Sequence, residues 1–289
     1  MEKRSETKRQ AAGSNRAFIL ALLGAVFVSA AAILFFQGIM GLPKESGRNV
    51  AKNAPKSSSV AGKKANSKTV RIMANGDLLY HDGLYMSAQK ADGSYDFSEN
   101  FTYVKDWLQQ GDLVLGDFEG TIRPDYPLGG YPLFNAPEAV VPAIKNAGYQ
   151  VVDLAHNHIL DSGLEGVFTT AKAFEDHGIS PVGVYTHKNR DKAPILIKEV
   201  RGIKIAILAY SYGFNGLESN LSQEEVDHHL STFDEEKMKA EIKQAEKEAD
   251  ITVVMPQTGI EYQLEPNEEQ VELYHKMVDW GADIIFGGH

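Results

Sequence analysis

The chain has 289 residues, of which 43% are hydrophobic and 24% are charged, and it contains no cysteine. This composition is typical of a folded globular protein and excludes wholesale disorder. The lack of thiols excludes disulfides, thiolate metal sites and cysteine nucleophiles. The formal net charge of −10 argues against a nucleic-acid partner, because phosphate contacts need clustered Lys and Arg side chains.

The charge is divided unevenly along the chain. Residues 1–16 carry five basic and two acidic side chains, and residues 43–68 carry seven basic side chains and one acidic. Residues 17–42 carry no charge, so residues 69–289 hold a net charge of −19. A basic N-terminal part therefore precedes a strongly acidic part.

Residues 17–42 form an uncharged apolar segment of 26 residues, which exceeds the roughly 20 that a helix needs to cross a bilayer. A cleaved signal peptide is the alternative, with Val28-Ser29-Ala30 as its cleavage site. Signal-peptide apolar cores run only roughly 7–15 residues, so we interpret this segment as an uncleaved transmembrane signal anchor. Basic residues ahead of it place residues 1–16 in the cytoplasm and the C-terminal domain outside the cell membrane.

Residues 43–68 are rich in Lys, Ser, Asn, Ala and Gly and poor in large apolar side chains. Such a segment cannot bury enough surface to offset the entropy of ordering, so we predict a flexible basic linker. The folded domain is then expected at residues 69–289.

Within that domain, strand-like patterns alternate with helix-like ones. A capping-box pattern from Ser162 to Glu165 indicates the start of a helix, and Arg201-Gly202 between two apolar runs indicates a hairpin. The alternation predicts a layered α/β domain. The hairpin adds an antiparallel pair, so its sheet is expected to be mixed. In chain order the predicted strands are 70–75, 112–116, 149–155, 194–200, 203–210, 251–255 and 283–286, and the predicted helices are 137–148, 162–178, 233–249 and 267–280.

Polar side chains follow five of these strands where each strand ends. Ligands of open α/β sheets bind beyond the carboxyl ends of the strands, so these side chains are candidates for one site. Carboxylate, amide and imidazole groups suit Mn²⁺, Zn²⁺ or Fe. In order, the strand ends carry Gly76-Asp77, Gly116-Asp117-Phe118-Glu119, His156-Asn157-His158 with Asp161, Gln257, and Gly287-Gly288-His289.

Each element of this series has a simpler interpretation when it is taken alone. An Asp after a strand is commonly a helix cap or a turn former, and that is the default for Asp77. A lone His is usually structural, and His81 has no partner pattern. The functional interpretation depends on the ordered combination at successive strand ends.

The ordered motifs resemble those of the bacterial CapA/PgsA poly-γ-glutamate capsule-synthesis proteins, which belong to the calcineurin-like metallophosphoesterase superfamily. The resemblance covers about residues 70–289 and implies a four-layer α/β/β/α sandwich. It is carried by Gly76-Asp77, Gly116-Asp117-Phe118-Glu119, Asn157-His158-x-x-Asp161, Gly259-x-Glu261-Tyr262 and Gly287-Gly288-His289.

The resemblance also implies roles for individual residues around a pair of divalent metal ions, Mn, Zn or Fe. Asp77 would bind one metal, and Asp117 or Glu119 would bridge or bind the pair. Asn157 would ligate the second metal, and His289 would be an imidazole ligand. His158 would be the catalytic residue, acting as an acid or electrostatic partner of the leaving group.

Three departures from the family pattern put this site in question. Leu79 stands where superfamily enzymes usually have a ligating His. That ligand is therefore either absent or supplied by His81. Gln257 stands where the family usually has His, and an amide oxygen is the weaker ligand. The chain stops at His289, where the family would continue, so we interpret the domain as C-terminally incomplete.

Two functions follow as expectations. The first is a membrane-anchored extracellular protein in the synthesis of capsule, poly-γ-glutamate or a related surface polymer, with a metal-dependent phosphoesterase-type site. The second is a non-catalytic assembly or export subunit with a degenerate metal site. The resemblance implies the polymer and membrane synthase or export subunits as partners.

Overall fold

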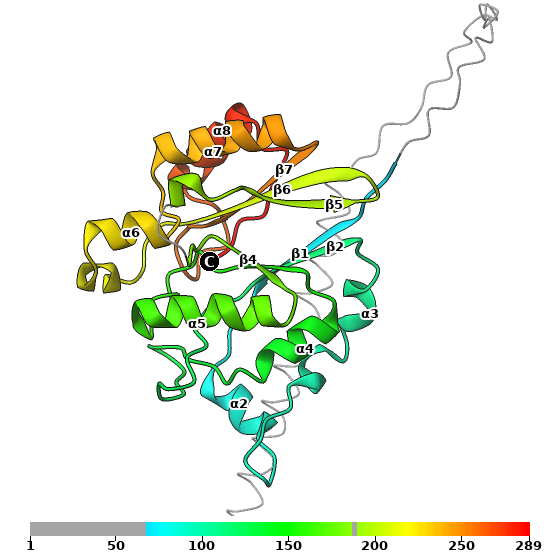
Figure 1. Ribbon diagram of the computed structural model, residues 1–289, viewed down its shortest axis with the longest axis vertical. Helices are drawn as coiled ribbons and strands as arrows, with labels where there is room; N and C mark the ends of the chain where they lie inside the picture. Colours follow the sequence, from blue (N-terminus) through cyan, green and yellow to red (C-terminus); the bar gives the residue numbers. More distant parts are fainter. Residues whose placement is uncertain (1–67, 187–189) are drawn as a thin grey trace, which may run out of the picture. The chain divides into compact units, whose positions relative to one another are not determined.

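Two four-stranded sheets lie face to face in the part of the chain that the computed structural model describes, residues 68–186 and 190–289 (Figure 1). The first sheet is entirely parallel, with the order β1 (Ile72–Asp77), β2 (Leu113–Asp117), β3 (Val151–Asp153) and β4 (Ser180–Val182). In the second sheet β5 is antiparallel to β6 and the others run parallel; its order is β5 (Leu196–Val200), β6 (Ile203–Ser211), β7 (Ile251–Gln257) and β8 (Ile284–Ile285). The predicted α/β fold and the hairpin at Arg201-Gly202 are confirmed.

Helices cover the outer face of each sheet (Figure 1). Side chains of α4 and α5 pack with the first sheet, and those of α7 and α8 with the second. The arrangement has four layers, as the resemblance implies. The α-helices of the described residues are α2 (Asp82–Ala88), α3 (Lys105–Leu108), α4 (Val140–Ala147), α5 (Gly163–Asp176), α6 (Gln223–His229), α7 (Glu235–Glu248) and α8 (Glu268–Trp280).

The space between the sheets is filled by branched apolar side chains from both. Leu115 and Val151 of the first sheet share one buried cluster with Ile205, Ile207 and Val253 of the second. Strands that are covered on both faces need such continuous apolar runs. The two sheets are therefore held together by hydrophobic burial, and their carboxyl ends keep a fixed relation to each other.

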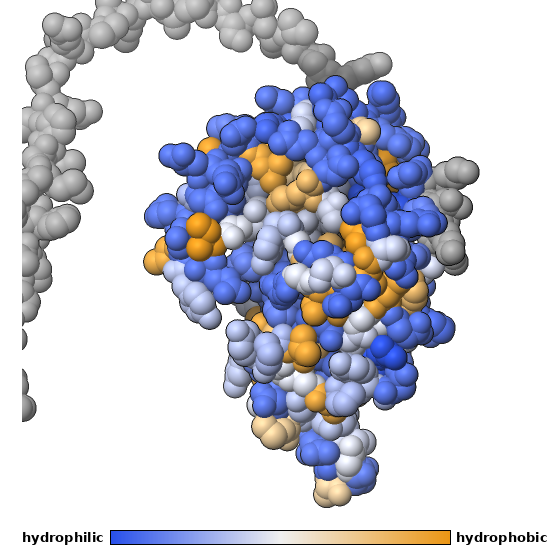
Figure 2. Space-filling model, turned by 90° about the vertical axis from the view of Figure 1, so that its left-hand side faces the viewer, coloured by the Kyte–Doolittle hydropathy of each residue, from blue (hydrophilic) through white to orange (hydrophobic). Residues whose placement is uncertain are grey.

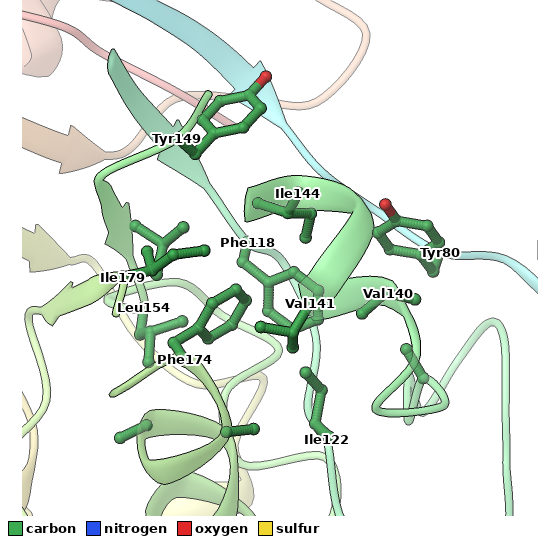
Figure 3. Close-up of a cluster of buried hydrophobic side chains, with 14 of the residues drawn as sticks. Tyr80, Phe118, Ile122, Val140, Val141, Ile144, Tyr149, Leu154, Phe174 and Ile179 are labelled. Carbon is green, nitrogen blue, oxygen red and sulfur yellow. The ribbon is translucent and has the colours of Figure 1, made fainter. Parts of the chain in front are cut away.

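Phe118 anchors the end of β2 in the core below the first sheet (Figure 3). Its ring is 1% exposed and meets Phe174 of α5 with the ring centroids 4.9 Å apart. Side chains alternate between the two sides of an extended chain. Burial of Phe118 on the helix side therefore turns the neighbouring Asp117 and Glu119 towards the other side.

The helix boundaries follow from the local sequence, with one correction. Helix α4 ends at Gly148, whose φ of +120° suits only glycine. The predicted capping box at the start of α5 is wrong, because the hydroxyl of Ser162 makes no cap bond and instead donates to Thr121 Oγ1 at 2.8 Å. A capping box is present at the start of α8, where Asn267 and Gln270 bond reciprocally.

Among residues 68–186 and 190–289, no helix combines the length and the apolar character that crossing a membrane requires. The predicted segments at 1–16 and 17–42, and almost all of the predicted linker at 43–68, lie outside the described residues.

Candidate functional site

Three aspartates stand side by side at the carboxyl ends of the first sheet. The strand register pairs Asp77 with Asp117, and Asp117 with Asp153. An irregularity in β1 between Ala74 and Asp77 precedes the first of these pairs. Paired residues of parallel strands project to the same face. The structure thus brings the predicted Asp77 and Asp117 together and adds Asp153, which the sequence analysis did not select.

Asp117, Asp153 and the nearby Glu119 are crowded and buried, whereas Asp77 at the edge of the row is exposed. Asp117 is 4% exposed, Asp153 2% and Glu119 6%. Burial, followed by the negative charges of Asp153 and Asp77, raises the pKa of Asp117 well above its usual range. Burial, opposed by the N–H of Ala155 and reinforced by Asp77, likewise raises the pKa of Asp153.

Glu119 belongs to the same acidic cluster, which consists of Asp77, Asp117, Glu119 and Asp153. Burial raises its pKa to about 9, with further contributions from the charge of Asp77 and from a hydrogen bond to that carboxylate. Glu119 faces His158, with Oε1 and Nε2 3.8 Å apart. Four acids with so little compensating charge are a group that would bind a cation.

A cavity of about 380 Å³ opens beside the cluster, and Asp117 and Asp153 lie in its wall. Gly287 and Gly288, which follow β8, also line it. A Cβ atom on Gly288 would lie 3.2 Å from Asp117 Oδ2 and 3.9 Å from Asp77 Oδ1. Glycine at this position therefore allows the main chain to approach both carboxylates.

Asn157 is held by residues of the second sheet and of the loop after β6. Its main-chain N–H donates to Gln257 Oε1 at 2.6 Å, and its Nδ2 donates to Asn215 Oδ1 at 3.3 Å. Its side chain also hydrogen-bonds to the Tyr212 hydroxyl. The remaining group, Oδ1, is buried and has no partner among the described residues. The free oxygen is the atom through which an amide ligates a metal.

His158 is oriented by a carboxylate. Its Nδ1–H donates to Asp161 Oδ2 at 2.8 Å, and the same oxygen accepts the main-chain N–H of Phe134 at 2.6 Å. The ring of Phe134 stands edge-on to the imidazole at 4.8 Å. These contacts fix the ring and leave Nε2 facing Glu119.

His156 has the structural role expected of a lone histidine. Its ring is fully buried and accepts the main-chain N–H of His158 on Nδ1 at 3.2 Å. Burial, followed by the proximity of His158, lowers its pKa, so it is uncharged at neutral pH.

Three residues considered as metal ligands in the sequence make other contacts in the structure. The amide oxygen of Gln257 accepts the N–H of Asn157 at 2.6 Å, which uses one of its two lone pairs. The ring of His289 packs against Tyr212, with centroids 5.0 Å apart. His81, the suggested replacement for the ligand missing at Leu79, lies edge-on to Phe134 at 4.8 Å.

The described residues contain no group of three His, Asp or Glu side chains that is already arranged to hold a metal ion. The donor chemistry nevertheless fits one. Asp117 Oδ1, Glu119 Oε2 and Asn157 Oδ1 are buried oxygens without hydrogen-bond partners among these residues. Unpaired buried oxygens are costly, and divalent cations prefer this kind of ligand.

The surface around the strand ends is mainly hydrophilic, with separate hydrophobic patches (Figure 2). Tyr212, 45% exposed, lines a neighbouring groove of about 530 Å³ with Ile260 and Leu273. Burial, followed by the charge of Glu261, raises the pKa of Tyr212.

Two packed sheets with helices outside, and an oxygen-rich acidic cluster at the strand ends, define an α/β protein with a candidate cation-binding centre. The sequence model described as bacterial capsule synthesis protein PGA_cap matches residues 71–289. The chain therefore belongs to this family of bacterial capsule synthesis proteins.

Two relatives are similar over most of the domain. The capsule biosynthesis protein CapA of Bacillus anthracis is 32% identical over 197 residues, which cover 65% of this chain and 47% of that protein. The PGA biosynthesis protein CapA of Bacillus subtilis (strain 168) is 30% identical over 196 residues, covering 65% of this chain and 50% of that protein. The matches thus extend over about half the length of these curated relatives.

Proposed function

We propose that this chain takes part in the synthesis of capsule or a related surface polymer and that its acidic cluster holds divalent metal ions, a pair of Mn, Zn or Fe. The buried, unpartnered oxygens of Asp117, Glu119 and Asn157 carry this proposal. Asp77 lies next to them through the register of β1 and β2. The calcineurin-like metallophosphoesterase resemblance supports the same assignment.

A bound cation pair would polarise a substrate oxygen and lower the pKa of a water molecule. The chain's own residues supply orientation and proton handling. Asp161 holds the imidazole of His158 with Nε2 towards Glu119, which is the position for protonating a leaving group. Tyr212, Asn215 and Gln257 hold Asn157 so that its Oδ1 stays free. The substrate class is a phosphoester, or an amide of an extracellular polymer such as poly-γ-glutamate.

Metal binding is tested by titrating Mn²⁺ or Zn²⁺ into the full chain and measuring bound metal by equilibrium dialysis. The wild-type chain is expected to bind, and the variant Asp77→Ala/Asn157→Ala to lose most of that binding. Asp92→Ala, which changes an exposed acid distant in sequence from the cluster, is the matched control. Absence of binding by the wild type, or equal binding by the double variant, contradicts the proposal.

The second candidate is a non-catalytic assembly or export subunit, and one observation favours it. Position 257 is Gln, where the family usually has His, so an imidazole ligand of a phosphoesterase-type site is missing, and the Gln257 oxygen accepts a structural hydrogen bond. Under this alternative the extracted chain co-purifies with membrane synthase or export proteins, and a metal-loaded sample does not cleave a model phosphodiester such as bis(p-nitrophenyl) phosphate. Cleavage by the wild type that is lost in His158→Gln supports the enzyme instead.

The location belongs to the same proposal. The apolar residues 17–42 would anchor the chain in the cell membrane, with residues 1–16 in the cytoplasm and the domain outside. An acidic domain repels a polyanion, so bound cations or the basic residues 43–68 would have to mediate contact with polyglutamate.

A further inference from the structure

A helical turn with three exposed apolar side chains projects from the first sheet. Tyr103 is 91% exposed, Val104 45% and Trp107 66%. Tyr103 and Val104 directly precede α3 (Lys105–Leu108), and Trp107 lies in it. Leu108 of the same turn is buried in the core and fixes its position.

This turn lies beside the point where the described chain begins. Arg71 donates its main-chain N–H to Asp112 Oδ2 at 2.9 Å and its guanidinium to the carbonyl of Gln110, two residues beyond α3, at 3.4 Å. Thr69 accepts a hydrogen bond from Arg201 in the β5–β6 turn at 3.2 Å. The beginning of the domain, α3 and that turn thus share the end of the molecule that carries the amino ends of β1, β2 and β6 (Figure 1).

The same end carries exposed basic side chains, although residues 69–289 are strongly acidic as a whole. Lys68, Arg71, Lys105 and Arg201 are all exposed. Two acids offset part of this charge, because Asp112 forms an ion pair with Arg201 at 2.6 Å and the exposed Asp106 lies next to Lys105 in α3. Exposed Tyr and Trp among Lys and Arg is the composition found at membrane–water interfaces.

We propose that this end of the domain, with Tyr103, Val104 and Trp107 at its centre, docks on the lipid surface of the membrane. The inference rests on the proposed anchor at residues 17–42. The predicted linker at residues 43–68, 26 residues long, would have a root-mean-square span of about 30 Å, which would keep this end near the bilayer. Docking directs the acidic cluster, at the carboxyl ends of the strands, away from the lipid.

A second copy of the chain is the weaker fit to this surface. A stable dimer buries about 800 Å² on each partner, whereas aromatic side chains supply about 150–250 Å² each. Two exposed aromatic rings and one valine fall short of that area. They are sufficient for an interfacial contact that a tether already keeps close.

The test places single tryptophans at opposite ends of the full chain in phosphatidylcholine–phosphatidylglycerol vesicles that contain brominated lipid. The chain has two tryptophans, so Trp280→Phe leaves only Trp107. The triple variant Trp107→Phe/Trp280→Phe/Leu264→Trp puts the fluorophore at a fully exposed position in the loop after β7. Brominated lipid is expected to quench the first variant several-fold more strongly than the second.

The outcomes separate the docking surface from the anchor. Equal quenching in vesicles that carry the chain on flotation overturns the docking surface and leaves the anchor standing. Failure of the chain to float with vesicles overturns both. Lys105→Glu in the otherwise wild-type chain is expected to weaken quenching, and Lys243→Glu, an exposed lysine of α7, is expected to leave it unchanged; equal effects of the two also overturn the proposal.

Discussion

Gln257 Oε1 accepts the main-chain N–H of Asn157 at 2.6 Å, and this hydrogen bond joins the carboxyl end of the second sheet to that of the first. Both residues are at most 2% exposed. A buried N–H that loses its acceptor costs free energy. Gln257 therefore acts on the site through Asn157.

Removing this acceptor tests that relationship. Gln257→Leu is expected to lower the free energy of unfolding by about 1–3 kcal/mol, because the N–H of Asn157 stays buried without a partner. Urea denaturation of the full chain measures the change. Gln263→Leu, at an exposed position, is the control and should remain within about 0.5 kcal/mol of the wild type.

A double-mutant cycle on metal affinity separates positioning from direct ligation. If Gln257 acts only through the side chain of Asn157, then Gln257→Leu lowers Mn²⁺ affinity in the wild-type background and has no effect in Asn157→Ala. Isothermal titration of the four proteins gives the coupling. Additive losses would show that Gln257 contacts the metal itself.

The acidic cluster predicts an unusual pH dependence for the metal-free chain. The pKa of Glu119 is raised to about 9, and those of Asp117 and Asp153 are also raised. Between roughly pH 5 and pH 9 the folded chain therefore holds more protons than the unfolded chain, so the free energy of unfolding falls as pH rises. Denaturation in EDTA at pH 5.5 and pH 8.5 measures this fall.

Two comparisons assign that pH dependence to the cluster. Asp117→Asn removes one of the raised carboxyl groups and should flatten the profile. Saturating Mn²⁺ should stabilise the chain most at pH 8.5, where the carboxylates are ionised and can bind it. A metal-free stability that rises from pH 5.5 to pH 8.5 in the wild type, and equally in Asp117→Asn, contradicts the predicted role.

Two glycine-to-alanine variants test whether the close approach of the main chain at Gly288 to Asp117 matters for metal binding. Gly288→Ala places a Cβ 3.2 Å from Asp117 Oδ2, so the carboxylate has to shift. Gly76→Ala adds a Cβ with no atom within 4 Å. Mn²⁺ affinity is expected to fall in Gly288→Ala and to stay unchanged in Gly76→Ala. Equal affinities would mean that the position of Asp117 is not critical.

Substitution of Phe118 measures how much the buried ring next to the site contributes to the free energy of unfolding. Phe118→Ala is expected to cost about 3–5 kcal/mol of unfolding free energy, because it leaves a cavity between α4 and α5 (Figure 3). Tyr103→Ala, at a 91% exposed position, is the control and should change the stability of detergent-solubilised chain by at most about 0.5 kcal/mol. Thermal or urea unfolding checks both.

Long periodic elements could be predicted from the sequence, and short ones could not. Helices α7 and α8 lie within two residues of their predicted bounds, because amphipathic pattern and capping residues act locally. Strand β4 is only Ser180–Val182 and contains a proline, so its assignment depends on pairing with β3. Helix α6 has only seven residues. The apolar pattern does not predict it, although the Ser222–Glu225 capping box marks its start.

The candidate site was predictable as a set of strand ends but not as a set of contacts. Asp153 lies inside a predicted strand, and only the register of β2 and β3 shows that it stands beside Asp117. The use of the Gln257 oxygen depends on a contact between residues 100 positions apart. Such long-range relations have no local signal in one sequence, whereas a Gly-Asp pair at a strand end does.

The order of synthesis gives the division between the two sheets a further meaning. All four acids of the cluster come from residues 77–153, whereas Asn215 and Gln257, which hold Asn157, come later in the chain. A growing chain therefore contains every carboxylate before the elements that close the site exist. Contacts this distant in sequence carry a large loop-closure entropy, so the second sheet would complete the centre only after all of its carboxylates are present.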